Sequence, residues 1–291
     1  MHMHALDCTL QERILGVACN VQSDTFRFSV ALPLRPRTRR GLLSTVNSLF
    51  DPLGFVAPVV LEVRLIYRNL CQMELELDEP MPEQAVRRWE RWLSSLPDLR
   101  SISIPRSFHL NSYENMHKCQ IHCFADASTL AYGAVCYIHA VDHKSEVVCT
   151  LGMAVPAEET SIPRLELMAA VMAVELERSV KKELNLDLRP SAFWTDSKVV
   201  SQSIRNDMKR FQSFVARRLA VIEKNTCISN WRHVPTKQNP ADLVFRGTTS
   251  AALVRSEIWL TGPEFLKDDP RNWPDPGDAC SDVDPTVFEK S

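Results

Sequence analysis

Four acidic residues stand in distinctive short motifs in the second half of this 291-residue chain. They are Asp126 in Phe-Ala-Asp-Ala-Ser, Glu166 in Pro-Arg-Leu-Glu-Leu, Asp196 in Trp-Thr-Asp-Ser and Asp242 in Asn-Pro-Ala-Asp. Four carboxylates that converge can hold two divalent metal ions, which activate a water molecule and stabilise the leaving oxygen in phosphodiester hydrolysis. Because oxygen ligands without Cys or His suit Mg²⁺ or Mn²⁺ rather than zinc, we expect two such ions here.

The elements around these acids follow the order β-β-β-α-β-α-α-β-α. Strands are predicted over residues 119–126, 132–139, 146–153, 191–195 and 228–234, with helices starting near residues 161, 198, 211 and 240. This order predicts an α/β (α+β) fold, a mixed five-stranded sheet flanked by helices.

The predicted order also explains how the four acids meet. Asp126 ends the first strand and Asp196 ends the fourth, so parallel pairing of these strands would bring the two carboxylates side by side. Glu166, one turn into a helix, and Asp242, in the first turn of another, can point across the same strand ends. Like charges at this range raise each other's pKa, so a bound cation would stabilise the cluster.

The first hundred residues show another pattern. Strands over 13–18 and 25–30 with a polar turn at 22–24 predict an N-terminal β-hairpin. Helices over 41–50, 59–75 and 82–96 predict a small helical unit after it. The stretch 262–291, rich in Asp and Pro, is expected to be a poorly ordered connector.

Composition limits the class of protein. The chain is 45% hydrophobic and 24% charged with a formal net charge of -2, which excludes a strongly basic nucleic-acid binder but not a local basic patch. No apolar run approaches the roughly 20 residues of a membrane span. Because the sequence shows no targeting signal, a cytoplasmic or nuclear location is expected.

The nine cysteines are expected to be free, mostly buried thiols in a reducing compartment, since their number is odd and they are widely spread. The cluster of His117, Cys119, His122 and Cys123 raises the question of zinc. On a strand, Cys119 and Cys123 face one way and His122 the other, which argues against a shared ion.

Several stretches of the sequence resemble a known family. Residues 118–247 resemble the ribonuclease H domain of retroelement polyproteins, specifically of the Bel/Pao group. The Arg-Gly-Leu-Leu-Ser run at 40–44 and the stretch at 47–58, Asn-Ser-Leu-Phe-Asp-Pro-Leu-Gly-Phe-Val-Ala-Pro, are similar to the region that follows the palm of these reverse transcriptases. Segments at 259–263 and 273–274 resemble the connector toward the integrase.

The resemblance implies three regions. Residues 1–105 would be the C-terminal, thumb- or connection-like part of a reverse transcriptase, often labelled a Pao peptidase. Residues 118–250 would be the ribonuclease H-like domain, and 251–291 a connector with a partly disordered tail. Peptidase activity is rejected, because an aspartic peptidase needs Asp-Thr-Gly or Asp-Ser-Gly and neither occurs.

The resemblance also implies an activity. Asp126, Glu166, Asp196 and Asp242 correspond to the four metal-binding catalytic acids of the family. The implied reaction cleaves the RNA strand of an RNA–DNA hybrid internally, leaving 3′-hydroxyl and 5′-phosphate ends. The implied partners are the hybrid itself and the remaining reverse transcriptase or integrase segments of a parent polyprotein.

Further residues are assigned to substrate contact. Ser128 and Ser197 stand beside catalytic acids, where they would contact the backbone phosphate or the 2′-hydroxyl that marks RNA. His233 would assist product release or metal exit. A basic grip would come from Arg205, Lys209 and Arg210, helped by Arg217 and Arg218, or from the arginines at 35–40.

Two features keep alternatives open. The paired aspartates of a polymerase palm are missing, and Phe245 stands where the family has a small Ser. Each acid taken alone also suits a helix start or a turn without any metal. An inactive retroelement remnant, or a co-opted protein that binds nucleic acid without cutting, is therefore the alternative function. A scaffold that uses only the fold is the third hypothesis.

Overall fold

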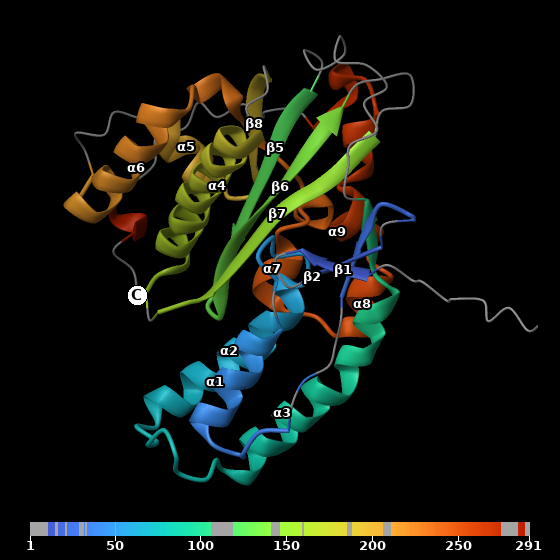
Figure 1. Cartoon of the computed structure of the whole chain (residues 1–291). Helices are drawn as coiled ribbons and strands as arrows, with labels where there is room; N and C mark the ends of the chain where they lie inside the picture. The colour runs from blue at the N-terminus through green and yellow to red at the C-terminus, as the bar shows by residue number, and fades with distance from the viewer. Residues whose placement is uncertain are drawn as a thin grey trace, which may run out of the picture.

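The computed structural model of this chain describes twelve stretches of the sequence. They are residues 11–14, 17–20, 22–28, 32, 34–49, 51–105, 119–140, 146–158, 160–184, 188–205, 211–274 and 285–288. The second half holds a five-stranded sheet (Figure 1). Its strands are β5 (Cys119–Ala127), β6 (Ala131–Ala140), β7 (Glu146–Pro156), β8 (Arg189–Thr195) and β9 (Trp231–His233).

The order across this sheet is β7-β6-β5-β8-β9. The first three strands form an antiparallel meander, while β8 runs parallel to β5, and β9 parallel to β8. The predicted mixed five-stranded sheet is confirmed, including the parallel pairing on which the meeting of the acids depends.

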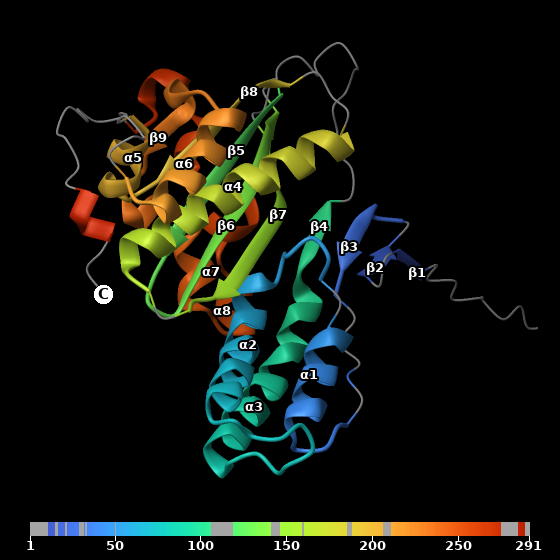
Figure 2. The ribbon, with the colours of Figure 1, turned by 90° about the vertical axis from the view of Figure 1, so that its left-hand side faces the viewer.

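Three helices cover one face of the sheet (Figure 2). They are α4 (Ile162–Leu184), α5 (Lys198–Arg205) and α6 (Ser213–Asn225). One face of α4 is buried, where Leu165, Ala169 and Leu176 share one hydrophobic cluster with Ile121 and Ala125 of β5. This packing holds the N-terminal turn of α4, which carries Glu166, beside the ends of the strands.

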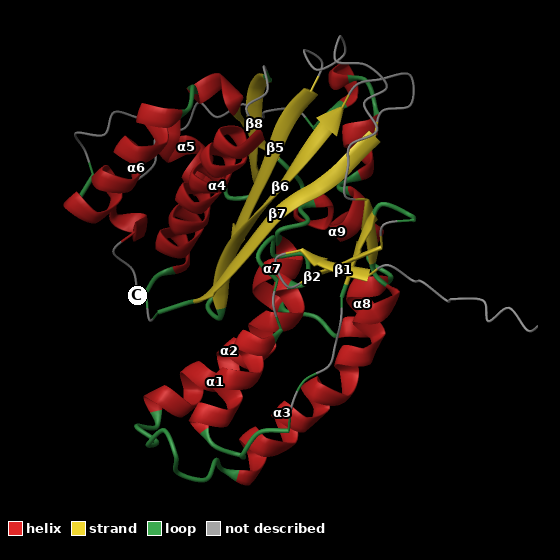
Figure 3. Cartoon of the chain, in the orientation of Figure 1, coloured by secondary structure: helices red, strands yellow, loops and turns green. Residues whose placement is uncertain are grey.

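The N-terminal region has a sheet of its own and three helices (Figure 3). The elements are β1 (Gln11–Ile14), β2 (Val17–Asn20), β3 (Thr25–Arg27), α1 (Arg39–Ser48), α2 (Ala57–Gln72), α3 (Glu83–Ser95) and β4 (Ser103–Pro105). The turn at 22–24 and the three helices are confirmed.

The predicted hairpin is incomplete. The single strand expected over 13–18 is divided between β1 and β2, which pair antiparallel with each other. β4 adds a fourth strand by pairing with β3, which places Ile104 opposite Phe26. Sequence periodicity misses β4 because three residues are too short to show an alternation.

The helical unit is anchored to the opposite face of the sheet through the Asp-Pro-Leu-Gly motif at 51–54. Gly54 has a φ of +71°, and a Cβ there would lie 1.7 Å from the carbonyl oxygen of Gly152 in β7. The Gly152 amide donates to the Leu53 carbonyl at 2.9 Å. Asp51 accepts from the amides of Phe55 and Val56 just before α2, at 2.9 and 2.8 Å. Glycine is thus required because two backbones touch.

Three short helices follow β9 and pack on the same face as α2. They are α7 (Asp242–Arg246), α8 (Ser250–Val254) and α9 (Glu257–Thr261), so the helix expected at Pro240 is not the last. Leu61 of α2, Phe124 of β5 and Trp259 of α9 belong to one buried cluster. The Trp259 indole donates to the Phe55 carbonyl at 2.7 Å, so the helical unit and the sheet share a core.

The expectation of a poorly ordered connector is wrong for residues 262–274. Phe265, Leu266 and Trp273 are buried in the same cluster, and the Trp273 ring lies edge-on to the His122 ring with centroids 5.0 Å apart. The Asp- and Pro-rich composition conceals these few large apolar side chains, which is why the sequence argument failed. Residues 275–284 and 289–291 lie outside the described part of the chain.

Strand alternation in β5 is confirmed. Cys119 and Cys123 lie in the cluster beneath α4, whereas His122 contacts Trp194 and Trp273 on the other face. His117 lies outside the described residues. The cysteines and histidines of this strand therefore do not share a face, as the sequence predicts.

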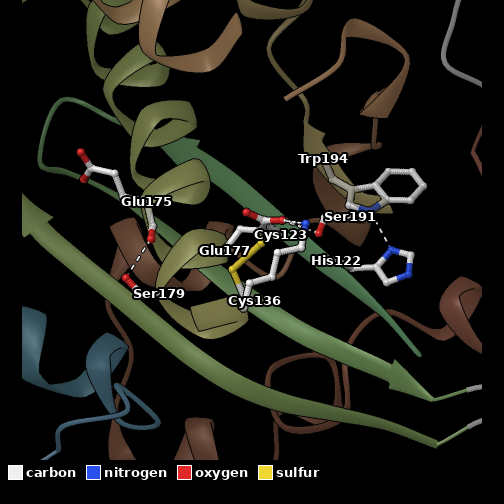
Figure 4. Close-up of a disulfide and its surroundings, with 9 residues drawn as sticks. His122, Cys123, Cys136, Glu175, Glu177, Ser179, Ser191 and Trp194 are labelled. Atoms are coloured by element: carbon white, nitrogen blue, oxygen red, sulfur yellow. Dashed lines mark hydrogen bonds and ion pairs between the residues drawn. A yellow bond between two sulfur atoms is a disulfide. The ribbon is translucent and has the colours of Figure 1, made fainter. Parts of the chain in front are cut away.

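The expectation of free thiols is wrong for one pair, because Cys123 and Cys136 form a disulfide (Figure 4). The register of β5 and β6 places these residues directly opposite each other, with Cα atoms 4.2 Å apart, a relation that the sequence does not reveal. Cys71, Cys119 and Cys227 are free. Figure 4 also shows Ser191 of β8 donating to the buried Glu177 of α4 at 2.6 Å.

Among the helices that the structure describes, none combines the length and the apolar character needed to cross a membrane.

Replacing Trp273 by Ala tests the packing of residues 262–274. We expect the free energy of unfolding to fall by about 3 kcal/mol, the loss typical of a buried aromatic side chain. Denaturant unfolding of the full chain measures it, with Leu34→Ala as the control because the Leu34 side chain is fully exposed. Equal stability of the two variants would show that Trp273 is not packed.

Candidate active site

The register of the sheet brings the first two acids together. β5 and β8 run parallel, and Ala125 pairs with Thr195, so Asp126 and Asp196 each follow one member of the same pair. Both lie where the carboxyl ends of parallel strands meet, at one edge of the sheet. Asp126 is buried, with 6% of its surface exposed, whereas Asp196 is half-buried.

Glu166 is joined to this edge by Ser197. The Ser197 hydroxyl donates to Glu166 Oε2 at 2.6 Å and accepts from the Val200 amide at 3.2 Å, so it also caps the start of α5. The helix-start role that was considered for the acids is therefore filled here by Ser197, at the start of α5. Its hydroxyl is engaged by protein atoms, and Ser197 positions Glu166 in this structure.

Asp242 is joined to the other acids by Asn239, a residue to which the sequence argument gave no role. Asn239 is buried, and its Nδ2 lies 3.2 Å from the Ala125 carbonyl oxygen and 3.4 Å from Asp196 Oδ1. Its Oδ1 accepts from the Ala241 amide at 3.1 Å. The only signal in the sequence is its position three residues before Asp242 in the same motif.

The electrostatics show that the acids act on one another. Burial, followed by the nearby charge of Asp196, raises the pKa of Asp126 to about 9, with Asp242 and Glu166 adding to the rise. One hydrogen bond opposes the rise, from the Ala127 amide to Asp126 Oδ1 at 2.7 Å. The other oxygen, Oδ2, is buried without a hydrogen-bond partner.

The other two shifts have the same origin. Burial raises the pKa of Glu166, opposed by the Ser197 hydrogen bond and increased by Asp196. Burial also raises the pKa of Asp242, which Arg246 counteracts by an ion pair of 2.7 Å between its Nε and Asp242 Oδ1. Buried carboxylates that repel one another are typical of a functional site.

These residues fit a hard divalent cation in chemistry. The donors are all carboxylate oxygens, and Asp126 Oδ2 among them is buried without a hydrogen-bond partner. A cation would relieve the repulsion between the carboxylates. Within the described residues, however, no three His, Cys, Asp or Glu side chains form a ready ligand set. Arg246 occupies one oxygen of Asp242, whereas the Ser197 hydroxyl bonds Glu166 through Oε2.

The remaining predicted site residues lie at different distances from this cluster. Ser128 is in the turn after β5, and its hydroxyl accepts from the Leu130 amide at 3.1 Å. His233 is half-buried at the end of β9, paired in register with Thr195. Arg205 ends α5, while Lys209 and Arg210 lie outside the described residues.

The arginines at 35–40 are largely tied to the helical unit. Arg37 pairs with Glu90 and Arg40 with Asp78, both at 2.6 Å. Arg39 donates to Cys71 Sγ and to the Leu75 carbonyl. This arrangement favours a structural role for the stretch over a grip on nucleic acid.

Phe245, the departure from the family pattern, is buried in the cluster that joins α2 to the sheet. The large side chain is therefore accommodated by the helical unit beside it.

Comparison with known proteins identifies one family. Residues 38–197 match the family described as Pao retrotransposon-like RNaseH-like domain. The matched segment begins just before α1 and includes Asp126, Glu166 and Asp196, while Asp242 lies beyond it. No curated protein matches the sequence.

Solved structures show low similarity. LC11-RNase H1 in complex with an RNA/DNA hybrid is 17% identical, with a TM-score of 0.33 over 47% of this chain and 99% of that one. An N-terminal RNase H domain from Mycobacterium tuberculosis is 15% identical, with a TM-score of 0.32 over the same shares. The foamy viral protease-reverse transcriptase with dsDNA is 10% identical, with a TM-score of 0.43 over 70% of this chain and 40% of that one.

Replacing Asp126 by Asn tests the cost of burying this carboxylate among the other acids. Since the folded-state pKa of Asp126 is about 9 and its usual value is 3.8, the folded state binds more protons between these values. Stability of the metal-free protein should therefore fall as pH rises through that range, and Asn should remove this loss.

In EDTA at pH 8 we expect the Asp126→Asn variant to melt about 3 °C or more above the unchanged chain, with a smaller gain at pH 5. Thermal unfolding followed by circular dichroism measures it, with the exposed Asp98→Asn as the control. A lower melting temperature at pH 8 would show that the carboxylate is stabilised rather than strained.

Proposed function

This chain belongs to the Pao retrotransposon-like RNaseH-like domain family, and on that premise we propose that it is a ribonuclease H that cleaves the RNA strand of RNA–DNA hybrids. The observation that carries the proposal is the meeting of the acids at one edge of the sheet: Asp126 and Asp196 follow paired residues of β5 and β8, and Ser197 joins Glu166 to them. Burial first, and then the charges of Asp196, Asp242 and Glu166, raises the pKa of Asp126 to about 9. A scattered set of helix-capping carboxylates would not act on one another in this way.

Asp126, Glu166, Asp196 and Asp242 would hold two Mg²⁺ or Mn²⁺ ions. Such ions, when bound, activate water for in-line attack on the phosphodiester and stabilise the leaving 3′ oxygen, which leaves 5′-phosphate and 3′-hydroxyl ends. The chain supplies the positioning: Ser197 orients Glu166, and Asn239 fixes the distance between Asp196 and β5.

The hybrid would be recognised beside this cluster. The Ser128 hydroxyl accepts from the Leu130 amide, which leaves its hydrogen to donate to a phosphate or a 2′-hydroxyl. Arg205, with Lys209 and Arg210, would add backbone contacts, and His233 would assist release of product or metal. The LC11-RNase H1 structure, which holds an RNA/DNA hybrid, is consistent with this substrate class. Further reverse transcriptase or integrase segments of a parent polyprotein are proposed as partners.

A second candidate is a nucleic-acid-binding protein that does not cut. It is favoured by the absence of a ready three-ligand set in the described residues and by the ion pair that occupies Asp242. The two candidates differ in one outcome, cleavage in the presence of Mg²⁺.

We expect the purified chain to cut a labelled RNA–DNA hybrid with Mg²⁺ and Asp196→Asn to lose on the order of a hundredfold or more in rate, because a metal ligand is removed. Gel analysis of the fragments measures it, and calorimetry should show Mg²⁺ uptake only with Asp196 intact. The exposed Asp98→Asn is the control. Tight binding of hybrid by the unchanged chain without cleavage would reject the enzyme and support the second candidate.

Ser197→Ala should weaken Mg²⁺ binding by about tenfold or more, because a residue that orients a ligand is lost. Ser197→Thr, which keeps the hydroxyl, should restore most of the affinity. Calorimetric titration with Mg²⁺ measures both, and melting temperatures separate the expected loss of the α5 cap from the effect on the ion. Unchanged affinity in Ser197→Ala would remove its positioning role.

A further inference from the structure

A cavity of about 450 Å³ lies where the helical unit meets the segment after α7. Figures 1 and 2 show α2 and α3 running up to α7 and α8 at this junction. Its lining includes Arg88, Arg91, Trp92, Arg246, Thr248 and Thr249. Residues from two distant parts of the sequence thus form one basic concavity.

The charge of the cavity is unbalanced. Glu62 is its one acidic lining residue, and it accepts from Arg88 at 2.8 and 3.1 Å. Arg91 is exposed, and among the described residues no carboxylate forms an ion pair with it. Arg88 is paired with Glu62 and Arg246 with Asp242, so Arg91 adds a positive charge that no carboxylate of the described residues balances, in a chain whose formal net charge is -2. Such a local excess favours an anion.

The walls of the cavity are fixed before any ligand binds. The Trp92 indole donates to the Val59 carbonyl at 2.8 Å, which holds α3 on α2. The Thr248 amide donates to the Pro58 carbonyl at 3.2 Å, which holds the loop after α7 on the same helix. Gly247, with a φ of +68°, ends α7 and turns the chain into the cavity wall. These contacts fix the backbone around the cavity, which lowers the ordering cost of binding an anion.

Arg246 connects this cavity to the candidate active site. Its Nε lies 2.7 Å from Asp242 Oδ1, and the pair is one helical turn apart. The Arg246 side chain remains 62% exposed while Asp242 is 22% exposed, so the guanidinium lies on the open side of the carboxylate. One arginine is thus shared by the acid cluster and the basic cavity.

We propose that this cavity binds a backbone phosphate of the nucleic-acid strand, and that the phosphate draws Arg246 away from Asp242. Arginine forks match the oxygens of a phosphate in two-point contacts, and the threonine hydroxyls can donate to the same group. Once Arg246 turns to the phosphate, the Asp242 carboxylate is free to serve the acid cluster. Substrate binding and completion of the site are thereby coupled. This inference rests on the proposed function.

The first test measures the phosphate contact. Labelled RNA–DNA hybrid is titrated with the full chain carrying Asp196→Asn, which prevents cleavage, over a series of KCl concentrations at fixed Mg²⁺. Adding Arg91→Gln or Arg246→Gln should lower the slope of log affinity against log salt by about 1, since one phosphate contact is lost. Arg27→Gln, an exposed arginine in β3, should leave the slope unchanged.

The second test measures the release of Asp242 without nucleic acid. In the chain with all four acids intact, Arg246→Gln should tighten Mg²⁺ binding about two- to fivefold by calorimetry, because the carboxylate loses its competing partner. Arg91→Gln should leave Mg²⁺ affinity unchanged. A cavity that only stabilises the fold would not produce opposite effects on hybrid and on Mg²⁺, and melting temperatures of all variants check folding.

The outcomes separate the two proposals. If neither the unchanged chain without Mg²⁺ nor the Asp196→Asn protein binds hybrid at all, the proposed function fails and this inference with it. If it binds, and the Arg91→Gln and Arg246→Gln slopes equal the slope of Arg27→Gln, the cavity takes no phosphate and only this inference is overturned. If the slopes fall but Arg246→Gln does not tighten Mg²⁺ binding, the coupling to Asp242 is refuted.

Discussion

Repulsion between carboxylates at the end of two parallel strands is the constraint on which the rest of this structure depends. Asp126 and Asp196 follow paired residues of β5 and β8, and burial with the neighbouring charges raises the pKa of Asp126 to about 9. Each of the other three acids is held by one partner: Ser197 for Glu166, Asn239 for Asp196 and Arg246 for Asp242. The fold keeps these charges together at a cost in stability, which is characteristic of functional sites.

The helical unit belongs to this arrangement rather than standing apart from it. α2 packs on β7 and α7, and the contact of Gly54 with Gly152 fixes its position. The family match begins at residue 38, just before α1, and the shared core gives a physical reason why the helices and the sheet form one matched segment. The unit also contributes Arg88 and Arg91 to the basic cavity beside Asp242.

The aromatic side chains of β5 and β8 that pack in the cluster shared with α2 link residues 262–274 to the same edge of the sheet. Trp194 packs against His122 and Phe265, and it lies two residues before Asp196. Burial, with the nearby His139 and Arg232, holds the pKa of His122 well below its usual range, so this imidazole is neutral in the folded protein near neutral pH. Residues 262–274, whose composition suggests a poorly ordered tail, therefore cover the core behind β8, the strand that Asp196 follows.

The sequence by itself determined the order of strands and helices, the placing of each acid at an element end, and the opposite facing of Cys123 and His122. These follow from periodicity and capping, which are properties of neighbouring residues. Only the tertiary structure decided the β4 pairing, the Cys123–Cys136 disulfide, the burial of Trp273 and the roles of Asn239 and Arg246. The Asp242–Arg246 pair is local in sequence, but its role depends on the site around it. The other features depend on contacts between distant residues, whose register and packing exist only once the chain has folded.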